Sequence, residues 1–170
     1  MLIASKLIPS GRGLAPSLIR RAPHVELDWD TRQKSRFDAT DSAGMRFAVF
    51  LPRGHIVRGG DVLVRDDGTL VVVRALAQPL LVVTLGKGGS PHDLLRAAYH
   101  LGNRHVPLEV RVDRLQFEPD HVLAEMLRRM GLQVDAVEAA FEPEAGAYGP
   151  GSDHGHDHDH DHDHHGHAHA

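Results

Sequence analysis

The stretch of sequence that decides the fold is Tyr99-His100-Leu101-Gly102-Asn103-Arg104-His105-Val106-Pro107. Leu94, Ala98 and Leu101 recur at helical spacing up to this point, whereas residues 108–112 alternate between apolar and polar side chains, as a strand does. We therefore predict that a helix ends within this stretch and that a strand follows it.

The turn between this helix and this strand carries His105. Gly102 suits the left-handed conformation just past a helix end, and Pro107 prevents a return to helix, so the turn should be short and fixed. A single histidine in such a turn is either a hydrogen-bonded structural residue or a ligand. Which of the two applies depends on whether the rest of the chain contains other candidate metal ligands.

The composition excludes several classes of protein. The 170 residues are 41% hydrophobic, which is enough for a core in one domain or two small ones. No apolar run reaches the roughly 20 residues that span a bilayer, and the start lacks a secretory signal, so we expect a cytoplasmic protein without membrane contact. The chain has no cysteine, so any metal must be held by nitrogen and oxygen.

The formal net charge of −4 comes from the C-terminal end, because five of the 23 acidic residues lie within residues 153–163. Without them, 18 acidic residues face 19 basic ones, and the body of the chain is nearly neutral. The clusters Arg20-Arg21 and Arg128-Arg129 are small. They do not make the basic face that nucleic-acid binding requires, so we expect no nucleic-acid partner.

Two domains of an α+β protein are expected before the C-terminal end. Residues 1–75 are β-rich, with expected strands in residues 24–29, 46–51 and 69–73. Turns containing Asp and Gly are expected at residues 41–44, 58–61 and 66–68.

Residues 76–143 have the order βαββαβ, which is the ferredoxin-like arrangement of a sheet with two helices on one face. The strands are expected at residues 80–85, 108–112, 115–117 and 132–137. Ser90, Pro91 and Asp93 form a helix start with a capping box, and Gly131 closes the second helix.

Residues 144–170 are predicted to be a linker and a histidine-rich tail, with linker composition beginning at Pro143. Alternating His and Asp without apolar residues cannot pack into a core, so the tail should be disordered without metal. Neutral imidazoles bind Ni²⁺, Cu²⁺, Zn²⁺ or Co²⁺, whereas an affinity tag or an inert tail would not need the Asp and Gly interruptions. The predicted ligands of the tail are His154, His156, His158, His160, His162, His164, His165, His167 and His169.

Three histidines of the body are candidate metal ligands beside the tail. His105 lies in the fixed turn, His100 lies near the end of the preceding helix, and His121 opens the second helix beside Asp120. The remaining histidines, which we expect on the surface without a metal role, are His24, His55 and His92.

These features resemble the UreE type of urease accessory protein. The resemblance rests on residues 99–107, on Asp120-His121-Val122-Leu123, and on Phe141-Glu142-Pro143-Glu144-Ala145-Gly146-Ala147-Tyr148 before a histidine tail. Residues 27–35 look like the family's amino-terminal domain, so the likeness covers nearly the whole chain.

The resemblance implies a nickel metallochaperone without enzymatic activity. In that family the histidine at the position of His105 binds nickel between two protomers of a homodimer, and the tail collects further ions. The nickel then passes by way of a GTPase accessory partner into the active site of apo-urease. His100 and His121 match secondary metal-binding histidines of some members, although Pro119 stands where such members can carry another histidine.

Two other functions fit parts of the sequence. A general histidine-rich protein for metal storage or detoxification would need the tail but no special site in the body. A metal-dependent hydrolase is disfavoured, because the chain has no His-Glu-x-x-His helix and no compact group of ligands with a general base.

Overall fold

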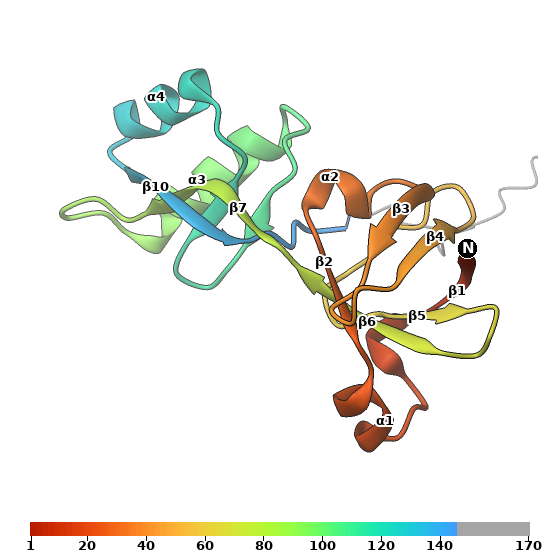
Figure 1. Ribbon diagram of the computed structural model, residues 1–170. Helices are drawn as coiled ribbons and strands as arrows, with labels where there is room; N and C mark the ends of the chain where they lie inside the picture. The colour runs from red at the N-terminus through yellow and green to blue at the C-terminus, as the bar shows by residue number, and fades with distance from the viewer. Residues whose placement is uncertain (146–170) are drawn as a thin grey trace, which may run out of the picture.

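The computed structural model describes residues 1–145, which form a mixed α+β structure with two β-sheets (Figure 1). The predicted disorder of the tail, its nine histidines and the linker beyond Ala145 lie outside the described residues. Within residues 1–145, no helix has the length and the apolar character needed to cross a membrane.

The first sheet is built from residues 2–75, which confirms the prediction of a β-rich N-terminal region. Its strands are β1 (Leu2–Ile8), β2 (His24–Leu27), β3 (Arg36–Thr40), β4 (Arg46–Phe50), β5 (Val62–Arg65) and β6 (Leu70–Ala75). They lie side by side in the order β2-β6-β5-β1-β4-β3. The 3-10 turn η1 (Pro9–Gly11) and the helices α1 (Pro16–Arg21) and α2 (Trp29–Arg32) connect them. Buried Val25, Phe47, Leu63 and Val73 belong to the core of this sheet.

The hairpin turn between β3 and β4 lies where the Asp and Gly residues predict it. The Asp41 carboxylate accepts hydrogen bonds from the N–H groups of Ala43 and Met45, both at 2.9 Å, and it also pairs with buried Arg65. Burial raises the pKa of Asp41, but Arg65 and the N–H donors outweigh burial and hold this pKa below its ordinary value. The Asp41 carboxylate therefore stays charged and paired with Arg65 at neutral pH.

Strand β1 lies in the middle of the first sheet, although the sequence pattern does not predict it. It pairs in parallel with β4 and antiparallel with β5, and its register with β5 shifts between Ala4 and Lys6. The shift breaks the strict alternation of side chains that would mark a strand. Residues 2–8 consequently lack a period-two signal.

The second sheet has four strands, and each strand is antiparallel to its neighbours. The strands are β7 (Ala77–Thr84), β8 (Glu109–Val110), β9 (Leu115–Phe117) and β10 (Gln133–Ala140), in the order β10-β7-β9-β8. Helix α3 (Pro91–Gly102) follows β7, and helix α4 (His121–Arg129) follows β9. Strand β8 is shorter than the predicted strand of residues 108–112, and β10 continues to Ala140 instead of ending at Val137.

The start of α3 and the end of α4 confirm the predicted signals. Pro91 is the first residue of α3, and the Ser90 N–H donates to the Asp93 carboxylate at 2.8 Å, which closes the capping box. Gly131 follows α4 with a φ of +86°, the left-handed conformation that ends a helix.

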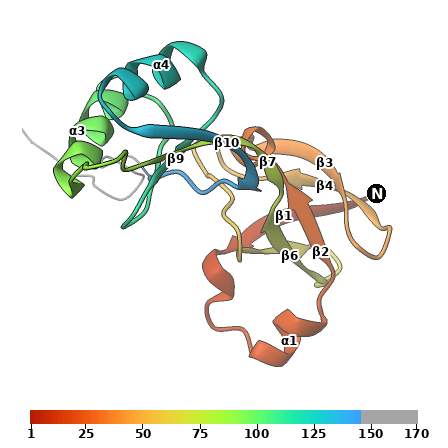
Figure 2. The same cartoon turned by 90° about the vertical axis from the view of Figure 1, so that its left-hand side faces the viewer.

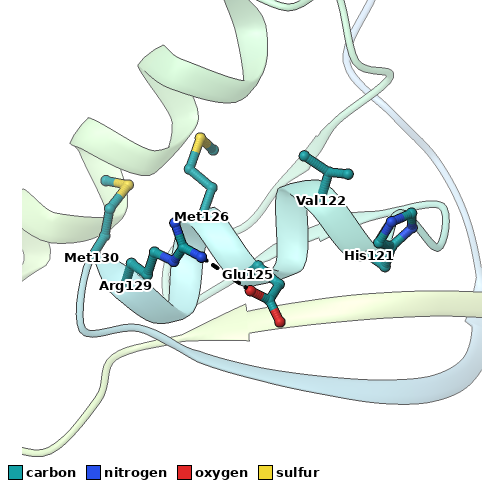
Figure 3. A pocket seen from close by; sticks show the side chains of 6 residues that line it. All are labelled: His121, Val122, Glu125, Met126, Arg129 and Met130. Atoms are coloured by element: carbon teal, nitrogen blue, oxygen red, sulfur yellow. Dashed lines mark hydrogen bonds and ion pairs between the residues drawn. The ribbon is translucent and has the colours of Figure 1, made fainter.

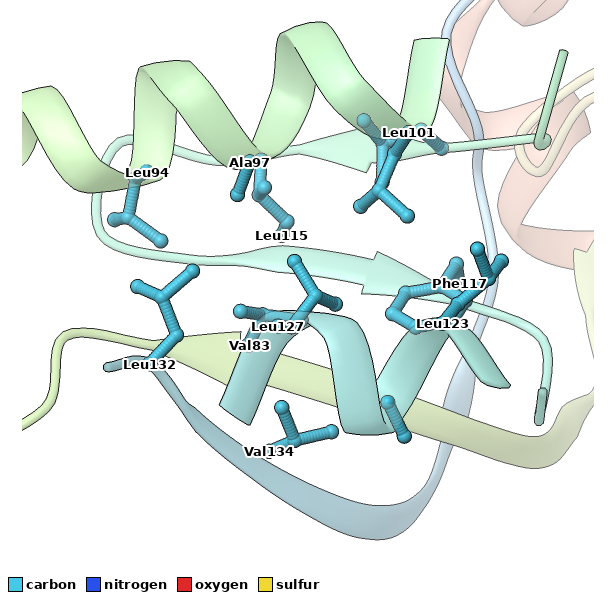
Figure 4. Close-up of a cluster of buried hydrophobic side chains, with 12 residues drawn as sticks. Val83, Leu94, Ala97, Leu101, Leu115, Phe117, Leu123, Leu127, Leu132 and Val134 are labelled. Carbon is cyan, nitrogen blue, oxygen red and sulfur yellow. The ribbon is translucent and has the colours of Figure 1, made fainter. Parts of the chain in front are cut away.

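Both helices cover the same face of the second sheet. Val83 of β7 pairs in register with Val134 of β10 and with Leu115 of β9, so these side chains point to one face. Leu101 of α3 and Leu127 of α4 are fully buried in one cluster with them (Figure 4). This core holds the C-terminal end of α3, and with it the turn that carries His105, against the sheet.

The two sheets form separate lobes that meet at a junction cluster of Trp29, Arg32, Arg58, Phe141 and Glu142 (Figure 1, Figure 2). Trp29 lies edge-on to Phe141, with 5.9 Å between ring centroids. Fully buried Arg32 donates to the Glu142 carboxylate at 2.7 Å and to the Phe141 carbonyl, and Arg58 pairs with the same carboxylate at 3.3 Å. The cluster ties the end of β10 to the first lobe.

Two predictions fail at this junction. Residues 24–29 do not form one strand, because the Asp28 carboxylate accepts from the Thr31 N–H at 2.8 Å and starts α2 at Trp29. Pro143 does not begin a free linker, because it is buried and its carbonyl accepts from Arg58 at 2.6 Å. Composition alone shows neither the local cap at Asp28 nor the long-range contact of Pro143.

Candidate metal centre

The turn that carries His105 ends α3 in a Schellman motif. The His105 N–H donates to the Gly102 carbonyl at 2.9 Å, and the Val106 N–H donates to the Leu101 carbonyl at 3.4 Å. His105 has a φ of +56° and occupies the left-handed position of the motif. The prediction that Gly102 adopts this conformation is wrong, since Gly102 still belongs to α3 and does not have a positive φ.

Three contacts fix the turn. Leu101 is fully buried, and Val106 packs against the same core, which is the apolar contact that accompanies a Schellman motif. The Arg104 guanidinium donates to the His100 carbonyl at 2.8 Å, one turn earlier. The predicted short, fixed turn is therefore confirmed, with His105 itself at its strained point.

Glycine at position 105 should make the protein more stable. A side chain in the left-handed region costs roughly 1–2 kcal/mol, and glycine escapes most of that cost. We expect His105→Gly to raise the free energy of unfolding by about 1 kcal/mol in urea titrations. Arg104→Gly is the matched control: it has no positive φ to relieve, so glycine there should lower stability. A loss of stability in His105→Gly would mean that the imidazole makes stabilising contacts.

The His105 side chain is exposed beside a cavity of about 400 Å³. The cavity lies between the His105 turn, strand β8, Trp29 and the segment that follows β10. It is mostly apolar apart from His105 and one carboxylate, that of Glu144. Its lining residues are Trp29, Gly102, His105, Val106, Pro107, Leu108, Val110, Pro143, Glu144 and Ala145.

His100 lies on a different surface from His105 within one chain. It is half-buried, and its ring lies edge-on to Tyr99 with 5.5 Å between centroids. It lines a separate hollow of about 420 Å³ on the outer face of α3, together with His92, Leu95, Arg96 and Tyr99. The structure therefore does not bring His100 and His105 into one cavity.

His121 is the first residue of α4 and is exposed. Asp120 caps this helix by accepting from the N–H groups of Val122 and Leu123, both at 2.9 Å. The helix borders a hollow of about 490 Å³ (Figure 3), lined by His121, Val122, Glu125, Met126, Arg129 and Met130. The nearby carboxylate of Glu125 pairs with Arg129 at 3.4 Å, so it is not paired with the imidazole.

Residues 1–145 contain no group of three or more His, Asp or Glu side chains placed to hold a metal ion together. Of the histidines expected on the surface, His55 and His92 are exposed, whereas His24 is half-buried beside Ser42. Residues 1–145 of one chain therefore offer separate imidazoles rather than a complete set of metal ligands.

Glu144 and Trp29, which are not among the predicted ligands, both line the cavity of His105. Both lie in stretches that carry the family resemblance, but the sequence does not show that these distant parts of the chain meet at one cavity. Glu144 comes from the segment after β10, and Trp29 comes from the first lobe.

Two family models and several relatives match the chain. The model described as "UreE urease accessory protein, N-terminal domain" matches residues 4–76, and the model of the C-terminal domain of the same family matches residues 78–169. The urease accessory protein UreE of Methylibium petroleiphilum is 65% identical over 156 residues, which cover 91% of this chain and 72% of that protein.

Other relatives agree with this assignment. The urease accessory protein UreE of Albidiferax ferrireducens is 64% identical over 152 residues, covering 89% of this chain and 87% of that protein. The corresponding protein of Cupriavidus necator is 50% identical over 155 residues, covering 91% and 79%. The chain therefore belongs to the UreE family of urease accessory proteins.

Proposed function

We propose that this chain is a nickel-binding metallochaperone that delivers Ni²⁺ for assembly of the urease active site. The observation that carries the proposal is His105, an exposed imidazole held in a strained left-handed turn at the rim of a cavity. Backbone strain at a single exposed polar residue marks a position where chemistry outweighs stability. Because the chain belongs to a family of urease accessory proteins, urease is the protein that would receive the ion.

The available donors suit metal transfer. The chain has no cysteine, so its ligands are imidazole and carboxylate groups. Such donors bind first-row divalent ions without the closed thiolate cage of a structural zinc site, which leaves positions open for exchange. The same donors bind Zn²⁺, Cu²⁺ and Co²⁺, so delivery of nickel has to depend on the partners as well as on affinity.

A homodimer completes the site by bringing two copies of His105 to one ion. The apolar surface beside the turn supports this arrangement, because Val110, which lines the cavity of His105, remains 44% exposed and Val112 is fully exposed. Large apolar side chains grouped beside a functional turn are typical of a surface that another protein covers. A twofold axis near His105 would place two copies of each ligand at the ion, so no additional ligand residue would be needed.

The tail supplies further imidazoles to the same place. The described chain ends at Ala145, which lines the cavity of His105. Eight residues lie between Ala145 and His154, the first tail histidine, and the nine steps from one to the other span at most ~30 Å in an extended chain. Tail histidines, together with His100 and His121, can therefore collect ions and exchange them with the central site.

The second sheet with α3 and α4 is, in this proposal, a ferredoxin-like metal-binding domain. Its strand order and its helices on one face support that assignment. The first lobe and the outer surfaces then remain available to a GTPase accessory protein and to the apo-urease complex. A general metal store is the second candidate, and the abundance of tail histidines favours it.

Co-expression with apo-urease and its other accessory proteins tests the proposal. The nickel content of purified urease should fall several-fold when this chain is left out, and His105→Ala should lower it as well. His55→Ala, an exposed histidine in another loop, is the control and should leave nickel loading unchanged. Equal nickel in urease with and without the chain would favour the storage function.

A further inference from the structure

The cavity beside His105 holds a second group that can bind metal. Glu144 lines the cavity together with His105, and it is exposed. Its carboxylate makes no hydrogen bond or ion pair with any residue in the described part of the chain. The structure thus places one imidazole and one unpaired carboxylate at a single cavity.

The backbone of Glu144 is fixed even though its side chain is unpaired. The Glu142 N–H donates to the Glu109 carboxylate at 2.8 Å, and the Glu144 N–H donates to the Leu108 carbonyl at 2.8 Å. The contact of residue 142 is with Glu109, and the contact of residue 144 is with Leu108, which is closer in sequence to the His105 turn. The backbone at Glu144 is therefore fixed beside the cavity, and its exposed carboxylate is free to bind an ion there.

Trp29 forms part of the wall of the same cavity. The indole N–H of Trp29 is buried and has no acceptor among residues 1–145, and Trp29 lines the cavity. A buried donor without an acceptor is costly, and native structures rarely leave one.

We propose that Glu144 is a ligand of the ion that His105 binds. Divalent nickel accepts nitrogen and oxygen donors together, and a carboxylate adds negative charge that an imidazole lacks. In a twofold dimer, two imidazoles and two carboxylates would surround one ion. This inference rests on the proposed function, since it requires the ion at His105.

The single tryptophan makes a sharp test possible in the full-length chain. Trp29 is the only tryptophan, and it lies both at this cavity and in the junction cluster, so its fluorescence reports on these two places. We expect Ni²⁺ to quench it, and we expect Glu144→Gln to shift the nickel concentration at half-quenching upward by about tenfold or more. Gln keeps the size and the backbone contact of Glu144, and its amide oxygen is a weaker donor. Glu138→Gln, an exposed acid on β10, is the control and should not shift the titration.

Three outcomes separate this inference from the proposed function. A shift in both Glu144→Gln and His105→Ala supports the assignment of Glu144. A shift in His105→Ala alone overturns it and leaves the proposed function intact. No shift in either variant overturns both, because the cavity would then hold no nickel.

Discussion

Alanine at position 105 should abolish the tight nickel site of a chain that lacks residues 154–170, while the chain remains dimeric. The shortened wild-type chain is expected to bind about half an ion per chain, because two copies of His105 share one ion on a twofold axis. His105→Ala removes both imidazoles at once. Even the loss of an outer partner of a metal ligand costs ~10–100-fold in affinity, so we expect a weakening of at least ~100-fold.

Metal analysis measures the number of ions bound per chain, and analytical ultracentrifugation measures whether the variant remains dimeric. His105→Gly serves as a second variant, since it removes the imidazole and relieves the left-handed strain; lost binding in both variants cannot then result from a distorted turn. His55→Ala should keep the site. Either a stoichiometry near one ion per chain or a tight site that survives in His105→Ala would contradict the shared site.

The second large effect concerns the junction cluster. Glu142→Ala should lower the free energy of unfolding by about 3 kcal/mol, because it leaves the guanidinium of fully buried Arg32 without its carboxylate. Burial lowers the pKa of Arg32, and the Glu142 carboxylate opposes that shift, so the buried charge depends on this partner. Arg58 would lose the same carboxylate.

Urea unfolding of the Glu142→Ala variant measures the loss. Asp30→Ala is the matched control, because it removes an exposed ion pair between Asp30 and Lys34 and should leave the midpoint unchanged. An equal midpoint for wild type and Glu142→Ala would show that the lobes do not depend on this ion pair. A transition that splits into two would show that Glu142 couples their unfolding.

Local signals in the sequence predict much of the fold. The capping box of Ser90 and Asp93, the glycine after α4 and the Asp-containing hairpin turn all act within a few residues, and all three were found where expected. The apolar stripe ending at Leu101 likewise predicts α3 and the turn after it. Such features depend on the backbone of a short segment, so neighbouring residues determine them.

Two kinds of feature are not predicted from the sequence: the exact residue at which a helix ends, and contacts between distant segments. Glycine is the usual residue at a left-handed helix end, which makes Gly102 the expected choice; the structure extends α3 through Gly102 and places His105 in that conformation instead. The position of Glu144 depends on backbone contacts with β8, and that of Pro143 depends on Arg58. The pattern of apolar and polar residues around Pro143 and Glu144 does not indicate these partners.

The direction of α3 has an electrostatic consequence for an ion at His105. The peptide dipoles of this 12-residue helix add along its axis, which gives its C-terminal end a partial charge of about −0.5. His105 follows that end directly, so a cation bound by its imidazole lies in an attractive field. In a twofold dimer, two helices would direct their negative ends at one divalent ion. The field would hold the ion without occupying any of its coordination positions, which leaves those positions open to a receiving protein.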